Sequence, residues 1–525
     1  MPGGIALAAA DCVDENRDWI SPVSLCVGDK GVVTALRGRP VRSVIVRDVS
    51  ALLALALVCR LAFLIAMPRV LDTADAVHYL RAAEHIASGS LLAVDPKIPI
   101  LYPAMVALFH LFALDLEWAG RTASLVFSVL LVLPVYLLSL DMHGARTARI
   151  AALTVAIWPW LMDYGCRVST ESLAVFLWFL AVWLFARGLR ENHPAWMAGA
   201  ALSFIALHET RPEGTFILLA AIPASLVLGF RVPGFRWRRL ALFGCLSGGA
   251  LLGHALYMKA VLGHATVNHR LSFIGEQPEG STVFVDFART FIAMTADVPA
   301  VMLGPVLWMF AGAGLFMAGD AQRDHRLEMF VLFFALVQWC VAIPVLSPSP
   351  RYIMATLIVA TLWSSRGIAV VGQWAGERSA RPSLRAAPAG VLVALMAFQA
   401  LVTVGADRVP GRVPREPREY KAVGQWMRSN VEAGLIMTRK PQVGYYAGMD
   451  SSGPRLDDSL EDIFVMARAG SFRYLVVDER HSARMVPALG PLLDPANAPS
   501  ELRLLRANLS PYPQARVVVY EFVFE

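Results

Sequence analysis

The chain has 525 residues, of which 56% are hydrophobic and only 17% are charged. Soluble domains usually carry about 25% charged residues, so the composition excludes a wholly soluble protein and predicts a polytopic α-helical membrane protein. The net charge of +6 does not indicate a nucleic-acid partner, because the arginines cluster at the ends of apolar runs, as membrane orientation requires. The six cysteines show no CxxC spacing, so neither a disulfide framework nor a cysteine zinc site is indicated.

Residues 1–48 are poorly patterned, and we expect a cytoplasmic N-terminal tail. The apolar stretch 5–10 is too short for a signal-peptide core and has no basic flank. Four arginines then precede the first long apolar run, at about 50–67: Arg37, Arg39, Arg42 and Arg47. Basic residues before a first span are typical of an N-terminus that stays inside.

The first polar segment after this run, residues 72–89, has a helical pattern. Apolar residues recur at spacings of three and four, while Asp75 and His78 fall on the opposite face. Asp72 is placed where an N-cap belongs, and Gly89 where a helix stops. We expect a short amphipathic helix on the outer membrane surface, with its acidic first turn over a cavity between the other helices.

Ten further apolar runs follow, at about 119–140, 148–163, 171–188, 195–208, 213–230, 238–261, 299–318, 327–346, 351–371 and 388–405. The run at 195–208 is short for a bilayer core of about 30 Å, so it is either tilted or forms a re-entrant pair with the next run. Both alternatives leave the later loops on the same sides of the membrane. If a helix at 101–113 lies in the outer interface, all arginine-rich loops fall on one side of the membrane. We therefore predict eleven spans, with the membrane domain over 49–405.

The region 406–525 changes character and predicts a small α/β domain outside the cytoplasm. Pro410, Pro414 and Pro417 mark a linker before it. Helices are expected at 419–429 and 460–469, and strands at 435–438, 474–477 and 516–524. The last strand is apolar on both faces, which favours an interior position in the sheet.

Acidic residues at the predicted outer ends of spans are the first candidates for chemistry. Asp75 either acts in catalysis or only complements the dipole of its helix. Glu171 stands where an exterior loop meets the next span, and an ionisable residue there is costly unless it has a role. Its alternative role is likewise that of a charge at a helix N-terminus.

Two arginines form the next candidates. Arg211, in a polar turn between two apolar runs, needs an anionic partner: Glu209, Glu213 or a ligand phosphate. Arg351 follows a Ser-Pro-Ser-Pro turn and either binds phosphate or anchors the chain at the interface.

The histidines do not predict a metal site. His78 and His85 are seven residues apart, which places them two helical turns from each other without an evident third ligand. His264 and His269 offer a weaker case still.

Several motifs occur in an order that resembles the GT-C superfamily of membrane glycosyltransferases. They are Asp75 four residues before Tyr79, Tyr102-Pro103 opening a helix, Arg121 starting a span, Glu171 after a Tyr-Gly turn, the Arg211-Pro212-Glu213-Gly214 turn, and Arg351-Tyr352 before a late span. The chain is most similar to the branch with protein O-mannosyltransferases and lipid A aminoarabinose transferases (glycosyltransferase family 39), over about residues 50–375.

The resemblance implies inverting transfer of a hexose or pentose from a polyprenyl-phosphate donor to a lipid, glycan or protein acceptor, on the outer side of the cytoplasmic membrane. It assigns catalysis to Asp75 and Glu171, and substrate binding to Asp72, His78, Tyr79, Tyr102, Arg121, Arg211, Glu213, Arg351 and Tyr352. Many members carry a second acid where this chain has Ala76, so no tight metal site is implied; a divalent cation, Mg²⁺ or Mn²⁺, stays open as a cofactor.

Elementary chemistry favours the same function independently. A hydroxyl that attacks an anomeric carbon needs a carboxylate nearby, and a leaving phosphate needs arginines. The alternative is a secondary transporter or lipid flippase, in which buried charges would mark a substrate path. The sequence shows no inverted repeat and no broken helices in corresponding halves, which favours the enzyme.

Overall fold

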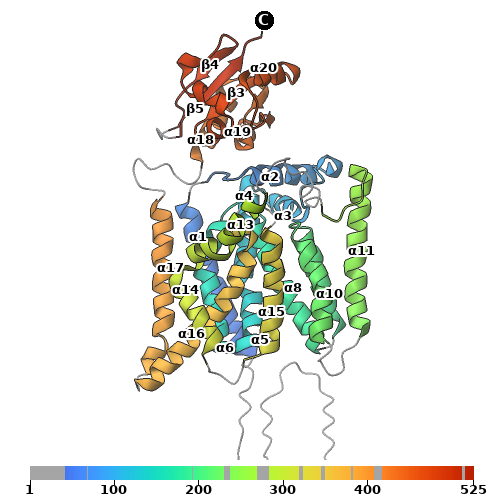
Figure 1. Cartoon of the computed structure of the whole chain (residues 1–525), viewed down its shortest axis with the longest axis vertical. Helices are drawn as coiled ribbons and strands as arrows, with labels where there is room; N and C mark the ends of the chain where they lie inside the picture. The colour runs from blue at the N-terminus through green and yellow to red at the C-terminus, as the bar shows by residue number, and fades with distance from the viewer. Residues whose placement is uncertain are drawn as a thin grey trace, which may run out of the picture.

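The structure is a computed structural model that describes residues 42–67, 69–191, 193–229, 237–268, 283–317, 323–343, 349–379, 382–406, 417–510 and 515–524. Its main part is a helical bundle, with a small sheet-containing region beyond one end (Figure 1). Most of the predicted N-terminal tail, the linker prolines Pro410 and Pro414, and His269 lie outside the described residues.

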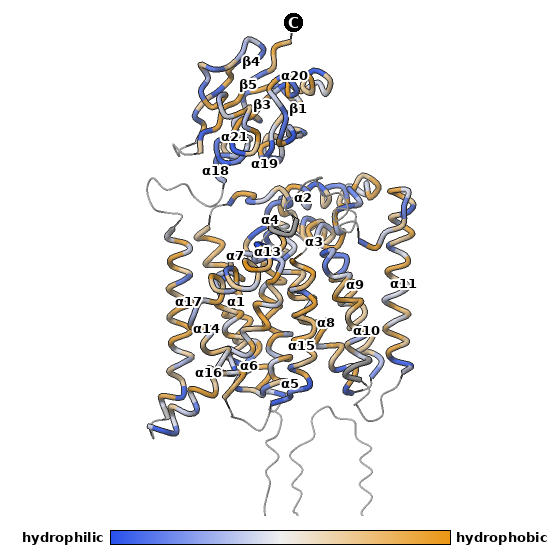
Figure 2. Tube along the Cα trace, in the orientation of Figure 1, coloured by the Kyte–Doolittle hydropathy of each residue, from blue (hydrophilic) through white to orange (hydrophobic). Residues whose placement is uncertain are grey.

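Eight helices of the described chain are long and apolar enough to cross a membrane, so this is a multi-pass membrane protein. They coincide with eight of the eleven predicted spans. They comprise α1 (Arg42–Ala66), α4 with α5 (Leu116–Leu130, Val132–His143), α8 (Glu171–Glu191), α11 (Trp237–Leu262), α13 with α14 (Val283–Ile292, Val298–Phe316), α15 (His325–Ala342), α16 (Met354–Arg378) and α17 (Ala387–Ala406). Apolar residues fill the middle of these helices (Figure 2).

The three other predicted spans are shorter or interrupted. The run at 148–163 divides into α6 (Ala145–Ile157) and α7 (Pro159–Gly165), because Pro159 forces Trp158 into an extended conformation with ψ 118°. The remaining runs form α9 (Pro194–His208) and α10 (Gly214–Gly229). The count of eleven spans therefore stays a prediction.

The α5–α6 connection, the end of α8 and the start of α15 lie at the bundle end opposite the sheet region (Figure 1). Ion pairs there join α1 to α6, α5 to α8, and α8 to the start of α15: Asp48–Arg149, Asp141–Arg187 and Arg190–Asp324. A shared end is what the predicted arginine bias requires. Which side of the membrane it faces stays a prediction.

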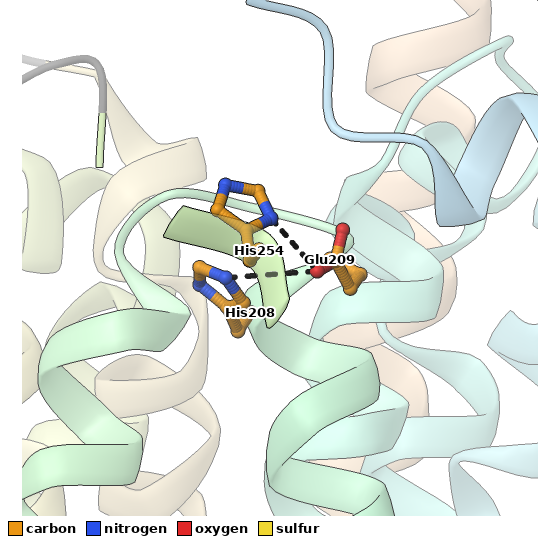
Figure 3. Close-up of side chains that lie close together, drawn as sticks. All are labelled: His208, Glu209 and His254. Carbon is orange, nitrogen blue, oxygen red and sulfur yellow. Dashed lines mark hydrogen bonds and ion pairs between the residues drawn. The ribbon is translucent and has the colours of Figure 1, made fainter. Parts of the chain in front are cut away.

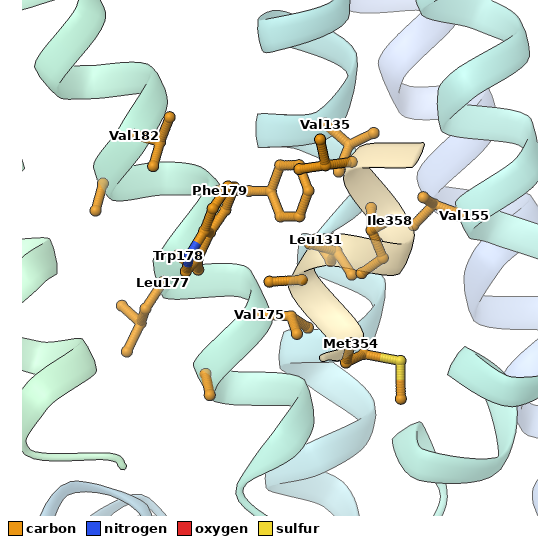
Figure 4. Packing of buried hydrophobic residues seen from close by; sticks show 14 of the residues in the cluster. Leu131, Val135, Val155, Val175, Leu177, Trp178, Phe179, Val182, Met354 and Ile358 are labelled. Atoms are coloured by element: carbon orange, nitrogen blue, oxygen red, sulfur yellow. The ribbon is translucent and has the colours of Figure 1, made fainter. Parts of the chain in front are cut away.

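The bundle interior packs large side chains from several helices. Figure 4 shows Phe179 of α8 pointing toward Val135 of α5, with Ile358 of α16 beside Val155 of α6. All four side chains are fully buried. Close packing of this kind resists displacement, so it fixes the helix ends that carry the polar residues described below.

Two helices, α2 (Ala74–Ala87) and α3 (Leu101–His110), lie across the opposite end of the bundle (Figure 1). The apolar face of α2 is buried, as its sequence pattern predicts. The expected N-cap was wrong: Thr73, not Asp72, has the extended conformation of a cap, and its Oγ1 accepts from the backbone N–H of Ala76 at 3.3 Å. Asp72 is drawn away by an ion pair with Arg167. Gly89, with φ +77°, follows the helix end as expected.

The C-terminal region contains a five-stranded sheet in the order β2-β1-β3-β5-β4. Its strands are β1 (Leu435–Met437), β2 (Ser451–Ser452), β3 (Phe472–Asp478), β4 (Leu502–Arg506) and β5 (Val517–Phe522). The expected strand β5 is paired on both sides, which confirms its interior position. The expected helices are α18 (Arg418–Asn430) and α20 (Leu460–Ala469), whereas β2, β4 and α19 (Pro441–Ala447) were not predicted.

Helix α19 and its surroundings contact the bundle directly. The hydroxyl of Tyr446 accepts from the backbone N–H of Leu71 at 2.8 Å and donates to Glu117 at 3.2 Å. The ammonium of Lys421 also reaches Glu117, at 3.3 Å. Arg81 of α2 pairs with Asp450 at 3.2 Å. The C-terminal region is thus docked over α2 and the start of α4.

Candidate functional site

A pocket of about 400 Å³ opens between the first turn of α2, the loop before α8, and the turn before α16. It is strongly polar and brings together three parts of the chain that are far apart in sequence, together with a lysine from the C-terminal region. Its charged and hydroxyl-bearing lining residues are Asp72, Thr73, Asp75, Tyr79, Tyr164, Arg167, Ser169, Glu171, Ser349, Arg351 and Lys440.

Asp75 and Arg351 form the pair at the centre of this lining. Nη1 of Arg351 lies 2.7 Å from Oδ2 of Asp75, although the two residues are 276 positions apart. Nη2 of Arg351 donates to the hydroxyl of Tyr352 at 2.9 Å, and the guanidinium lies over that ring. Nε of Arg351 is buried and has no hydrogen-bond partner among the described residues. The Asp75 side chain is 46% exposed, so an incoming molecule can reach it.

Arg211 is held between two carboxylates. Its Nη1 lies 3.1 Å from Oε1 of Glu171, the first residue of α8, and its Nε lies 3.3 Å from Oε2 of Glu213. Burial alone would lower the pKa of Arg211, but the charges of Glu213 and Glu171 outweigh it and raise the pKa. Glu213, one of the partners considered from sequence for Arg211, therefore binds it. Glu209 does not, and pairs with His254 instead.

A second, much smaller space with a mixed polar and apolar lining adjoins the Glu171–Arg211 pair. Glu171 and Arg351 line it as well as the main pocket, together with Trp178, Tyr352 and Met354. Polar groups at the pocket thus border directly on apolar side chains of α8 and α16. Its volume of about 30 Å³ has room for a water molecule but not for a lipid chain.

Asp72 lines the pocket with a partner that sequence reasoning missed. Arg167 forms an ion pair with Asp72 and donates from Nε to Asp163 at 2.9 Å. Arg167 is itself part of the lining. The spacing of four residues from Asp163 indicated that pair, but Arg167 and Asp72 are 95 positions apart, so the sequence could not show their contact.

Tyr79 and Tyr102 pack edge to face, with ring centroids 5.4 Å apart. Tyr79 lines the pocket, whereas Tyr102 is fully buried and does not. The hydroxyl of Tyr102 donates to the carbonyl of Gly120 at 3.0 Å and accepts from the N–H of Ser169 at 2.9 Å. Burial raises the pKa of both phenols, so both stay protonated. Tyr102 therefore supports the loop before α8 from beneath.

Two other predicted residues lie away from the pocket. Arg121 is buried in α4, where it pairs with Glu117 at 2.9 Å and donates to the carbonyls of Cys166 and Val70. Its role in the structure is to tie two loops to α4. His78 is exposed on α2 and is not part of the lining.

Lys440 is the contribution of the C-terminal region, and sequence reasoning missed it. It immediately precedes α19, which docks on α2, and so reaches the pocket. Burial lowers the pKa of the Lys440 ammonium, and the negative charge of Asp478 offsets this only in part. No local pattern in the sequence could place residue 440 beside residue 75.

Three carboxylates of the pocket lie beside arginines: Asp72, Asp75 and Glu171. Among the described residues, the one group of three His, Cys, Asp or Glu side chains close enough to share an ion lies elsewhere, at His208, Glu209 and His254.

Comparisons with known proteins agree with the motif order. Residues 97–248 match the family model described as dolichyl-phosphate-mannose-protein mannosyltransferase. No curated protein matches the sequence. The fold is similar to ArnT from Cupriavidus metallidurans, with a TM-score of 0.58 and 14% identity over 92% of this chain and 98% of that one.

Two further structures share the fold. ArnT from the same organism bound to undecaprenyl phosphate gives a TM-score of 0.57, at 14% identity over 90% of this chain and 98% of that one. The archaeal oligosaccharyltransferase AglB from Archaeoglobus fulgidus, in complex with an inhibitory peptide and a dolichol-phosphate, gives 0.56, at 14% identity over 82% and 69%. The resemblance to the GT-C glycosyltransferases is thereby confirmed at the level of the fold.

Proposed function

We propose that this chain is a membrane glycosyltransferase that moves a sugar, with inversion, from a polyprenyl-phosphate donor to a lipid, glycan or protein acceptor on the outer side of the cytoplasmic membrane. The observation that carries the proposal is the Asp75–Arg351 pair in the polar pocket of about 400 Å³. Structures of similar fold are described with undecaprenyl phosphate, or with dolichol-phosphate and a peptide, which supports a lipid-phosphate donor.

Asp75 serves as the base in this proposal. The acceptor hydroxyl gives its proton to the Asp75 carboxylate while its oxygen forms a bond to the anomeric carbon. The bond from that carbon to the phosphate oxygen breaks on the opposite face, and this displacement inverts the configuration. The exposure of Asp75 toward the pocket suits a group that must meet an incoming acceptor.

Arg351 and Arg211 bind the phosphate that leaves as polyprenyl phosphate. The free Nε of Arg351 offers a donor that the described residues do not use. Guanidinium groups bind phosphate oxygens through paired N–H donors and stabilise the charge that develops on the leaving group. Glu171 and Glu213 orient Arg211, and Lys440 adds a further cation at the pocket wall.

The test is a transfer assay with protein purified in detergent. Lipid extract from cells that lack the protein supplies the donor, and their envelope fraction supplies the acceptor. Mass spectrometry is expected to show release of polyprenyl phosphate and a sugar mass gained by an acceptor. A transporter or flippase makes no covalent product in detergent, so the absence of both products with a folded protein would overturn the proposal.

A further inference from the structure

Two histidines and a glutamate converge outside the candidate pocket, beside a second cavity. His208 ends α9, Glu209 follows it in the turn to α10, and His254 lies on α11 (Figure 3). Nδ1 of His254 lies 3.0 Å from Oε1 of Glu209, and Nε2 of His208 lies 3.7 Å from the same oxygen. The three ligand atoms lie within 4.8 Å of one another, and the dashed lines in Figure 3 show both rings directed at the one carboxylate.

His208 is oriented as a metal ligand would be. Its side chain is buried, at 5% exposure, and Nδ1 lies 2.8 Å from Oγ1 of Thr215. With a proton on Nδ1 donated to Thr215, the lone pair of Nε2 faces Glu209. Nε2 itself has no hydrogen-bond partner among the described residues, and a buried polar atom without a partner calls for an explanation. A hydrogen bond on the far ring nitrogen is the usual support of a histidine ligand.

We propose that His208, Glu209 and His254 bind a divalent ion of the zinc class. Two imidazole nitrogens and one carboxylate form a three-ligand set that zinc uses when its fourth position stays open. Imidazole ligands favour zinc over Mg²⁺ and Ca²⁺, which prefer all-oxygen surroundings. The fourth position faces a cavity of about 330 Å³ that Asp95, Tyr257 and Asn268 also line, so water can complete the coordination.

The ion would act as a brace. Glu209 and His254 are 45 residues apart, so binding links the α9–α10 turn to α11. The carbonyl of Glu209 also accepts from the backbone N–H of Leu101, which ties in the start of α3 at 2.9 Å. Arg211, two residues further on, contacts Glu171 at the candidate pocket. The ion thereby positions the segment that carries Arg211, and the inference does not depend on the proposed function.

Metal content of the full-length protein in detergent tests the proposal directly. After incubation with zinc and desalting, we expect one zinc per chain in the wild type, and its loss in His208→Ala, His254→Ala and Glu209→Gln. His264→Ala is the matched control, since His264 is an exposed histidine shortly after α11, and it is expected to keep the metal. A metal-free wild type, or equal loss in the control, would contradict the site.

Two measurements keep the test decisive if a ligand variant misfolds. Co²⁺ bound by the wild type is expected to give the visible absorption of a four-coordinate ion and to be displaced by zinc. Thr215→Val preserves shape but removes the hydroxyl that orients His208, so zinc affinity should fall about 10–100-fold. An unchanged affinity in Thr215→Val, or a six-coordinate Co²⁺ spectrum, would overturn the geometry proposed here.

Discussion

At the scale of single residues, the candidate pocket depends on contacts that no local sequence pattern encodes. Asp75, Glu171, Arg211 and Arg351 could be proposed from sequence because charges at span ends are costly and therefore conspicuous. Glu213 was among the partners considered for Arg211, but the partner of Asp75 could not be proposed, since Asp75 meets Arg351 across 276 residues. Sequence reasoning also judged the histidines by their spacing, and it therefore overlooked His208 and His254, which approach each other only through the fold.

Arg351→Lys is expected to weaken donor use more than folding. A lysine keeps the charge beside Asp75 but loses the fork that also reaches Tyr352 and offers Nε. Loss of one charge-assisted hydrogen bond is worth about 1.5–3 kcal/mol, so the donor KM should rise roughly 10–100-fold. Arg378→Lys, at the opposite bundle end, is the control. Equal donor KM in the two variants would remove Arg351 from the phosphate site.

Lys440 provides a prediction for pH. Because burial lowers its pKa in the folded state, the unfolded chain holds this proton more tightly, and folding is penalised below the folded pKa. The penalty disappears as pH rises from the folded toward the unfolded pKa. Lys440→Met should therefore raise the thermal midpoint at pH 7, and its advantage over wild type should shrink near pH 10. Lys440→Arg keeps its charge and should show no such convergence.

At the scale of elements, amphipathic pattern located α2, and the expected strands and helices of the C-terminal region were largely confirmed. The break between α6 and α7 was not predicted, although Pro159 was visible, because the apolar run continues through it. Helix α19 was missed for a different reason. It has only seven residues, too few for a helical period to stand out, and it forms where it packs on α2.

The corrected N-cap of α2 can be tested at this scale. Thr73→Ala removes the side chain that caps the helix, at a cost of about 1 kcal/mol. Hydrogen exchange at the amide of Ala76 should therefore accelerate about fivefold. Asp72→Asn should leave this amide unchanged, because Asp72 pairs with Arg167 instead. Faster exchange in Asp72→Asn than in Thr73→Ala would restore the original assignment.

At the scale of the whole molecule, two surfaces meet over the pocket: the bundle end with α2 and α3, and the docked C-terminal region. The docking places Lys440 beside residues of the bundle, so neither part forms the complete lining alone. If the arginine-rich end faces the cytoplasm, as the arginine bias predicts, the pocket opens on the other side of the membrane. The sequence could predict the helical bundle, the C-terminal α/β region and the arginine bias of the loops. It could not predict the contact between the bundle and the C-terminal region.

The orientation predicts where impermeant reagents can react. In a variant without exposed native cysteines, Leu92→Cys and Asn430→Cys should be labelled in intact cells by a membrane-impermeant maleimide, since both side chains are exposed at the pocket end. Arg378→Cys, at the arginine-rich end, should react only after permeabilisation. The reverse pattern would place the pocket in the cytoplasm and exclude an outer-face transferase.

The identity of the base is the central claim, and one pair of variants tests it. Asp75→Asn keeps the shape of the side chain but cannot take the acceptor proton, so the transfer rate should fall about 10²–10⁴-fold at matched expression. Glu84→Gln removes an exposed acid from the same helix and should transfer at the wild-type rate. Wild-type transfer by Asp75→Asn in the same assay would contradict the account.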